Sequence, residues 1–162
     1  MATQSAKEKK IEYDLAYPGI LPDNFLYKLK VLRDKITALL ISDPKKKVEY
    51  YLLQTDKGIL ASAMLVDKNK IELAQETALK AEHNYTLLTD ELWKISERPD
   101  ASFFKELTDS SLKHQEVLIS LVKRVPENKQ KTFNQVIEFS KRNLKSVEAY
   151  QKKRQEYEYE LQ

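Results

Sequence analysis

Cysteine is absent from this chain of 162 residues, and glycine occurs only twice. The lack of cysteine excludes a disulfide framework, a thiolate nucleophile and a metal site built from cysteine. Phosphate-binding loops and the dinucleotide fingerprint require clustered glycines, whereas Gly19 and Gly58 lie far apart in the sequence. We therefore expect no nucleotide bound by those routes, and we predict no cofactor.

Long apolar runs are also missing. A membrane-spanning helix needs roughly 18 or more consecutive apolar residues, and the apolar residues here occur only in short amphipathic groups. The stretch from Met1 to Lys10 is polar and lacks the apolar core of a secretory signal. We expect no transmembrane segment, and no signal peptide in the chain as given.

Histidine is as rare as glycine, occurring only at His83 and His114. Neither histidine has a glutamate three residues before it or a second histidine four residues away, so the common metal motifs of helical proteins are missing. We predict no metal site and no catalytic residue. An enzyme would need a pocket around His114 with a second titratable group converging on it.

The residues that are present favour helices. The chain is 41% hydrophobic and 33% charged, with few glycines and prolines, which is typical of an all-α protein of one domain. We predict an antiparallel bundle of about five helices with an extended N-terminal arm. The arm is expected over residues 1–22 and the bundle over 23–162, with helices over 24–42, 44–66, 70–97, 101–125 and 127–158.

The starts of three helices are marked by capping residues. Asp23 or Asn24 is expected to cap the first helix, Asp43 with Pro44 the second, and Asp100 or Ser102 the fourth. The apolar stripe of the first helix is expected to be buried; it consists of Phe25, Leu29, Leu32, Ile36 and Leu39. Stripes with similar spacing are predicted on the third helix (Ile71, Ala74, Ala78, Ala81, Tyr85, Leu88, Leu92 and Ile95), the fourth (Phe104, Leu107, Ser111, His114, Leu118, Leu121 and Val125) and the fifth (Phe133, Val136, Ile137, Ser140, Leu144, Val147 and Tyr150). The alanines from Ala74 to Ala81 predict that a partner helix approaches closely there. In the arm, Ile20, Leu21 and Phe25 are expected to attach the segment to the bundle.

Three features leave alternatives open. Gly58, inside the second helix, indicates either a close helix approach or a kink. His114 is expected to be a buried imidazole bonded to a neighbouring helix, or else a pH-sensitive switch, and His83 is expected to be exposed. The chain also has nine tyrosines, most of them toward its two ends, where they suit packing at the bundle edge or a binding surface.

Basic residues are concentrated in one part of the chain. Seven of them face only two glutamates: Lys123, Arg124, Lys129, Lys131, Lys141, Arg142 and Lys145. The simpler interpretation is a solvated helix surface, and the functional one is an interaction surface.

The opening motif resembles a known family. The residues that carry the likeness are Tyr17-Pro18-Gly19-Ile20-Leu21-Pro22-Asp23, Tyr27-Lys28-Leu29-Lys30, Leu32-Arg33-Asp34-Lys35-Ile36, Asp43-Pro44 and Lys46-Lys47-Val48-Glu49. Over about residues 13–92 the chain is similar to domain of unknown function 5667, found in exported and surface-associated prokaryotic proteins. The resemblance implies a helical domain outside the cytoplasmic membrane, without enzyme activity.

These observations predict a non-catalytic structural or protein-binding helical module. Its location is expected to be extracytoplasmic or at the cell surface, as the resemblance implies, and its partner is expected to be a protein or a component of the cell envelope. The alternative is a binder of nucleic acid or another anionic polymer through the basic surface of the fourth and fifth helices. Such binding would weaken steeply with salt.

Overall fold

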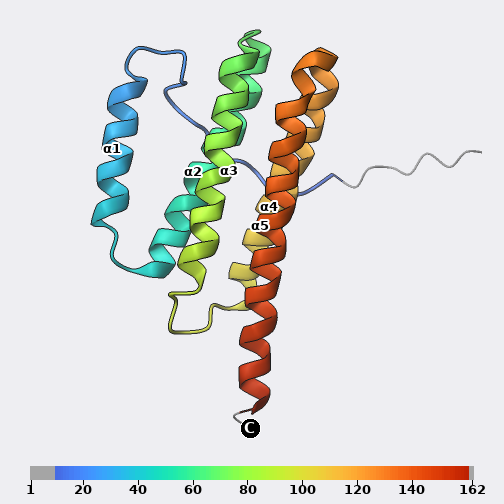
Figure 1. Cartoon of the computed structure of the whole chain (residues 1–162). Coiled ribbons are helices and arrows are strands. Elements are labelled where there is room, and N and C mark those ends of the chain that lie inside the picture. The colour runs from blue at the N-terminus through green and yellow to red at the C-terminus, as the bar shows by residue number, and fades with distance from the viewer. Residues whose placement is uncertain (1–9, 161–162) are drawn as a thin grey trace, which may run out of the picture.

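The computed structural model describes residues 10–160, which form five helices and no strand (Figure 1). The helices are α1 (Tyr27–Leu40), α2 (Pro44–Asp67), α3 (Ile71–Leu92), α4 (Ala101–Arg124) and α5 (Glu127–Glu160). Helices α2 to α5 pack together, with α2 against α3 and α4, and α5 against α3 and α4. Helix α1 stands beside this group of four (Figure 1). The predicted all-α bundle is confirmed.

Two of the predicted caps are confirmed, and one is wrong. The Asp43 carboxylate accepts a hydrogen bond from the Lys46 amide at 2.7 Å, and Asp100 accepts one from the Phe103 amide at 2.9 Å. By contrast, α1 begins at Tyr27 and has no side-chain cap, because residues 21–26 form tight turns. The Asp23 carboxylate instead pairs with Lys68 and Lys70, at the turn between α2 and α3.

Helix α3 also ends earlier than the sequence predicts. Its last residue is Leu92, whereas we expected the helix to continue to residue 97, before Pro99. The next two backbone bonds run from Lys94 to the Glu91 carbonyl and from Ile95 to the Leu92 carbonyl, so the chain tightens into turns. Ile95 is buried all the same, which is why its apolar periodicity imitated a longer helix.

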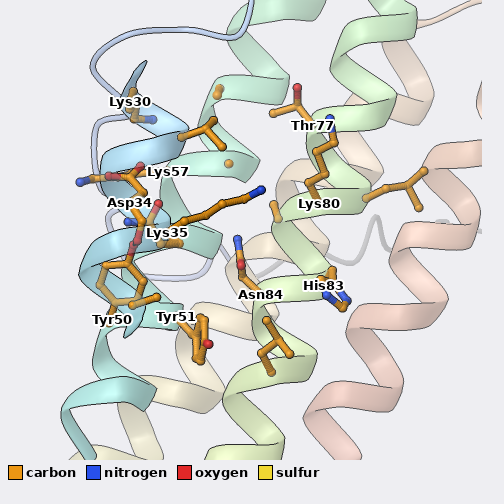
Figure 2. A pocket seen from close by; sticks show the side chains of 18 of the residues that line it. Lys30, Asp34, Lys35, Tyr50, Tyr51, Lys57, Thr77, Lys80, His83 and Asn84 are labelled. Atoms are coloured by element: carbon orange, nitrogen blue, oxygen red, sulfur yellow. The ribbon is translucent and has the colours of Figure 1, made fainter. Parts of the chain in front are cut away.

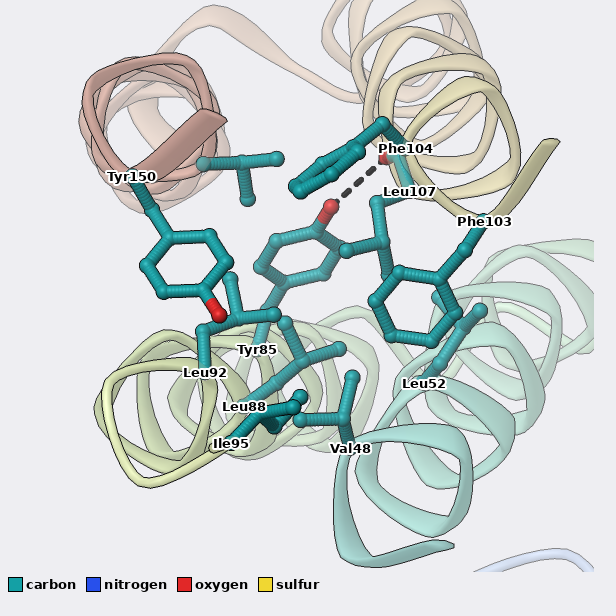
Figure 3. Packing of buried hydrophobic residues seen from close by; sticks show 11 residues of the cluster. Val48, Leu52, Tyr85, Leu88, Leu92, Ile95, Phe103, Phe104, Leu107 and Tyr150 are labelled. Carbon is teal, nitrogen blue, oxygen red and sulfur yellow. Dashed lines mark hydrogen bonds between the residues drawn. The ribbon is translucent and has the colours of Figure 1, made fainter. Parts of the chain in front are cut away.

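The core has two apolar clusters separated by a polar layer. Figure 3 shows the first cluster, where the Tyr85 hydroxyl donates a hydrogen bond of 2.6 Å to the Leu107 carbonyl. The second cluster lies nearer the turn between α2 and α3 and includes Ile59, Leu121 and Phe133. The stripes predicted for α3, α4 and α5 line these clusters, and only Ile71 and Leu144 of those residues are part-exposed.

The N-terminal arm lies across the bundle. The Ile11 amide donates to the Glu116 carboxylate of α4 at 2.8 Å, and the Tyr13 hydroxyl donates to Asp56 of α2 at 2.8 Å. Of the three residues expected to attach the arm, only Leu21 is buried; Ile20 and Phe25 are exposed because residues 21–26 turn away from the core. Leu15 also packs against the second cluster and Pro18 is buried, so the arm is held by apolar as well as polar contacts.

Some expectations concern residues outside the described range. Of the polar stretch from Met1 to Lys10, only Lys10 lies within the described range. The side chain of Tyr159 also lies outside it. Within residues 10–160, no helix is long and apolar enough to cross a membrane. The C-terminal part of α5 projects beyond the ends of the other helices (Figure 1).

Candidate functional site

The apolar stripe of α1 is exposed, contrary to the prediction that it is buried. Exposure ranges from 50% at Ile36 to 86% at Phe25, and no residue of α1 is buried. All five members are exposed, namely Phe25, Leu29, Leu32, Ile36 and Leu39, and so is the neighbouring Leu40. The periodicity of the stripe was read correctly, but its direction was not, because α1 turns its other side toward the bundle.

The side of α1 that faces the bundle carries few large apolar groups. Tyr27, Val31, Asp34 and Ala38 lie on it and are all part-buried. One hydrogen bond fixes the helix to α2, from the Tyr50 hydroxyl to the Asp34 carbonyl at 2.6 Å. Burial, helped by the Asp34 charge, raises the pKa of Tyr50 to about 12, so this phenol keeps its proton and remains a donor.

A groove of about 730 Å³ separates α1 from α2 and α3 (Figure 2). Small residues form part of its lining, among them Gly58, Ala61 and Ala81. Lysines contribute the charge: Lys30, Lys35, Lys47, Lys57 and Lys80. Asp34 is the one acidic residue among the lining residues, and its carboxylate pairs with Arg33 at 2.7 Å. The groove is therefore strongly basic.

The electrostatics of Lys30 reflect this excess of positive charge. Burial lowers its pKa, and the nearby Lys57 and Arg33 lower it further, while Asp34 opposes the shift. The Lys30 ammonium lies 5.3 Å from the centre of the Tyr27 ring, which is a weaker partner than a carboxylate. Lys47 and Lys80 have only long ion pairs of 3.7 Å, with Glu91 and Glu76, so an anion entering the groove would meet positive charge that the protein neutralises only in part.

A second group of polar residues is sealed inside the bundle. His114 Nε2 lies 2.7 Å from Asp56 Oδ1, and the ring is fully buried. The predicted buried imidazole bonded to a neighbouring helix is thus confirmed, and His83 is exposed as predicted. Asp56 does converge on His114, but neither residue lines the groove beside α1.

Glu82 completes the polar layer. Its side chain is buried and accepts a hydrogen bond from the Asn143 amide at 2.9 Å, while its other carboxylate oxygen has no partner. Burial raises the pKa of Glu82, and the nearby His114 opposes the shift. Among residues 10–160, no cluster of His, Asp and Glu has the arrangement of a metal site.

The seven basic residues predicted as an interaction surface do not all remain available. Arg124 pairs with Asp67, Lys129 with Glu72 at 2.6 Å, and Lys141 with Glu138 at 2.8 Å. Arg142 stacks over the ring of Phe139, and Lys123 also has an interaction partner. Lys131 and Lys145 are exposed on α5. These ion pairs leave less positive charge for a polyanion than the sequence indicates.

The groove lysines were missed by sequence analysis. Lys30 and Lys35 stand between the apolar positions of α1, and Lys57 and Lys80 are ordinary surface lysines by their spacing. A weak signal was present: the α1 region carries Lys28, Lys30, Arg33 and Lys35 against one aspartate. Which of them meet lysines of α2 and α3 depends on the orientation of α1, which periodicity does not determine.

Comparison with known proteins yields one match. The profile of the domain of unknown function 5667 family matches residues 19–128, more than half of the chain. The match covers α1 to α4 and the whole groove lining, whereas most of α5 lies beyond it. No curated protein and no solved structure matches. The resemblance suspected from the opening motif is confirmed, and the chain belongs to the domain of unknown function 5667 family.

Proposed function

We propose that this protein is a non-catalytic binding module that docks an amphipathic helix of a partner protein against the outer side of α1. The observation that carries the proposal is the exposed stripe formed by Phe25, Leu29, Leu32, Ile36 and Leu39. Monomeric proteins seldom leave several large apolar side chains together in water, and such patches commonly mark interaction sites. The stripe has the spacing by which helices pack on helices.

The charges beside the stripe favour an acidic partner. Lys28 and Lys35 lie along one edge of the stripe, and Arg33 lies along the other. A partner helix with glutamates beside its apolar residues would place opposite charges against them. A second copy of α1 would bring the same lysines together, so the charges disfavour a homodimer.

A location outside the cytoplasmic membrane is part of the proposal. Its support is the family, since the resemblance implies exported or surface-associated proteins. Labelling intact cells with a membrane-impermeant amine reagent provides the test, because the exposed lysines of an extracytoplasmic protein would be modified. Protection of the protein until the cells are lysed would contradict this location.

Binding is tested with a pair of designed helical peptides about three heptads long. Both carry leucine at the a and d positions; one has glutamate at e and g, and the other has lysine. We expect the acidic peptide to bind the whole chain and the basic peptide to bind at least about tenfold more weakly, as measured by fluorescence anisotropy. Equal binding of both peptides would contradict the assigned partner chemistry.

Substitutions locate the surface. The double variant Leu32→Ser/Ile36→Ser should lose at least about tenfold in affinity for the acidic peptide, because it removes the centre of the stripe. The matched control is Lys131→Gln/Lys145→Gln, which removes exposed charges from α5 and should leave binding unchanged. If the peptide-free protein sediments as a dimer, and Leu32→Ser/Ile36→Ser dissociates that dimer, then the stripe binds a second copy of the chain and not a partner helix.

A further inference from the structure

The groove behind α1 has the dimensions and lining of a site for a small molecule. Its volume of about 730 Å³ falls within the range of ordinary ligand pockets, which is about 300–1,000 Å³. Three helices contribute to it, so the lining is assembled from residues that are distant in sequence. The groove lies behind α1, and of the docking stripe of the proposed function only Leu39 reaches its lining.

Small residues bring the α2 and α3 wall of the groove close together. Gly58 and Ala81 meet where these helices cross, so closely that a Cβ on Gly58 would lie 2.5 Å from the Ala81 Cβ. Ala81 is thereby buried, so the apolar surface open to the groove belongs to part-exposed residues, among them Val31 and Ala38 of α1 and Leu87 of α3. A chain of methylene groups lying along these part-exposed residues would leave water on contact with apolar surface, which is favourable at about 25 cal/mol per Å².

The groove also holds cations that lack partners. Lys35 and Lys57 form no hydrogen bond or ion pair with any residue in the described part of the chain. Figure 2 shows Lys35 reaching from α1 across the groove toward Lys80 and Asn84 of α3. Lys80 itself has only a long contact of 3.7 Å, with the exposed Glu76. Ammonium groups from α1, α2 and α3 therefore border one space.

The combination of apolar wall and uncompensated cations selects one class of ligand. A neutral apolar molecule would leave the lysines without a partner, and a small hydrophilic anion would leave the apolar wall in contact with water. A single-chain amphiphile with an anionic head satisfies both parts of the lining. The Asn84 amide lies beside Lys35 in Figure 2, where it is placed to donate a further hydrogen bond to such a head.

We propose that the groove binds a small anionic amphiphile, with its apolar chain along Val31, Ala38 and Leu87 and its carboxylate or phosphate head held by Lys35 and Lys80. Either head group would accept the same lysine hydrogen bonds. The test therefore includes both. The groove shares Lys35 and Leu39 with the edge of the docking stripe, whereas Leu32 and Ile36 belong to the stripe alone, so variants can make the two proposals fail separately.

Binding is measured on the whole chain with 11-(dansylamino)undecanoate, whose fluorescence rises in an apolar site. Dodecanoate, dodecyl phosphate and dodecanol then compete for it, all below their micelle concentrations. We expect one saturable site and competition by both anions, with dodecanol at least about tenfold weaker. Equal competition by dodecanol would overturn the proposal, and a preference between the anions would identify the head group.

Variants confine the probe to the groove. Lys35→Gln/Lys80→Gln should weaken probe binding by at least about tenfold, because two charged hydrogen-bond donors are lost from exposed positions. Lys131→Gln/Lys145→Gln removes the same charge from α5 and should have no effect. Unchanged affinity in the groove variant would overturn the proposal.

A second pair of variants separates the two sides of α1. Ala38→Trp fills the groove from a part-exposed position and should abolish probe binding, whereas Leu32→Ser/Ile36→Ser alters only the outer stripe and should retain it. The opposite pattern would move the probe to the docking stripe and overturn the groove site. Circular dichroism checks the fold of each variant. If Ala38→Trp does not fold, the double lysine variant of the groove alone tests whether the probe binds there.

Discussion

Small side chains decide how closely α2 and α3 approach each other. Between the two alternatives for Gly58, close approach or a kink, the structure shows close approach, because Ala81 of α3 lies directly against it. The sequence also predicted that the alanine-lined half of α3, from Ala74 to Ala81, would receive a near neighbour. Both predictions depend on the size of a side chain, which the sequence states directly.

Gly58→Ala should destabilise the protein although alanine is the better helix former. The added Cβ would lie 2.5 Å from that of Ala81, so the helices must separate. Overpacking of this kind costs about 1–3 kcal/mol, which exceeds the roughly 1 kcal/mol gained in helix propensity. Urea unfolding measures the difference. The double variant Gly58→Ala/Ala81→Gly should recover part of the loss, and an increase in stability of the single variant would contradict the close approach.

At the scale of the element, α1 differs from the other four helices. Helices α3 to α5 bury the stripes that their periodicity predicts, whereas α1 has fourteen residues and none of them is buried. A helix of about this length is marginal in water on its own. It is held by the Tyr50 hydrogen bond, by contacts across the groove and by the two connections at its ends.

Amide hydrogen exchange should distinguish α1 from the bundle. We expect the amides of α1 to exchange at least about a hundredfold faster than those of α3 in the free protein, because local opening of α1 exposes little apolar surface. Exchange followed by mass spectrometry resolves the two helices. Addition of the acidic peptide should slow exchange in α1 and leave α3 unchanged. Equal protection of α1 and α3 without any ligand would show that α1 is an integral part of the bundle.

At the scale of the whole molecule, a polar layer connects the four packed helices and the arm. Tyr13 from the arm and Asp56 from α2 meet His114 from α4, while Glu82 of α3 meets Asn143 of α5. The layer separates the two apolar clusters, so it lies where all four helices must be in register. Its cost in stability depends on the charge of Glu82.

The pH dependence of unfolding should report that cost. Burial raises the pKa of Glu82 above its ordinary value of 4.5, so the folded protein keeps a proton that the unfolded chain releases as pH rises. The stability contributed by the protonated group is therefore complete below pH 4.5 and decreases as pH rises toward the pKa of the folded state. The neutral variant Glu82→Gln has no such dependence.

We expect the free energy of unfolding of Glu82→Gln, relative to the original protein, to rise as pH increases above about 4.5. Denaturant unfolding at several pH values measures it, and subtraction of the two proteins cancels the groups that titrate alike in both. Glu76→Gln, on the exposed side of α3, is the matched control and should give a flat difference. A flat difference for Glu82→Gln would show that its ionisation does not oppose folding.

The sequence by itself determined the helices, two of their caps and the buried stripes of α3 to α5. These features follow from local chemistry: the 3.6-residue period, the reach of an aspartate to nearby amides and the size of a side chain. It also identified the family, through the motif from Tyr17 to Glu49. The burial of His114 was also predicted correctly, because the apolar stripe of α4 that contains it faces a neighbouring helix.

Only the tertiary structure decided which way α1 faces. An amphipathic period indicates that one side of a helix is more stable away from water, but it does not indicate whether that side is buried by the same chain or by another molecule. The turns at residues 21–26 and the hydrogen bond from Tyr50 to the Asp34 carbonyl point the stripe outward. That orientation also brings Lys30 and Lys35 beside Lys57 and Lys80, so both the docking stripe and the basic groove arise from contacts between residues that are distant in the sequence.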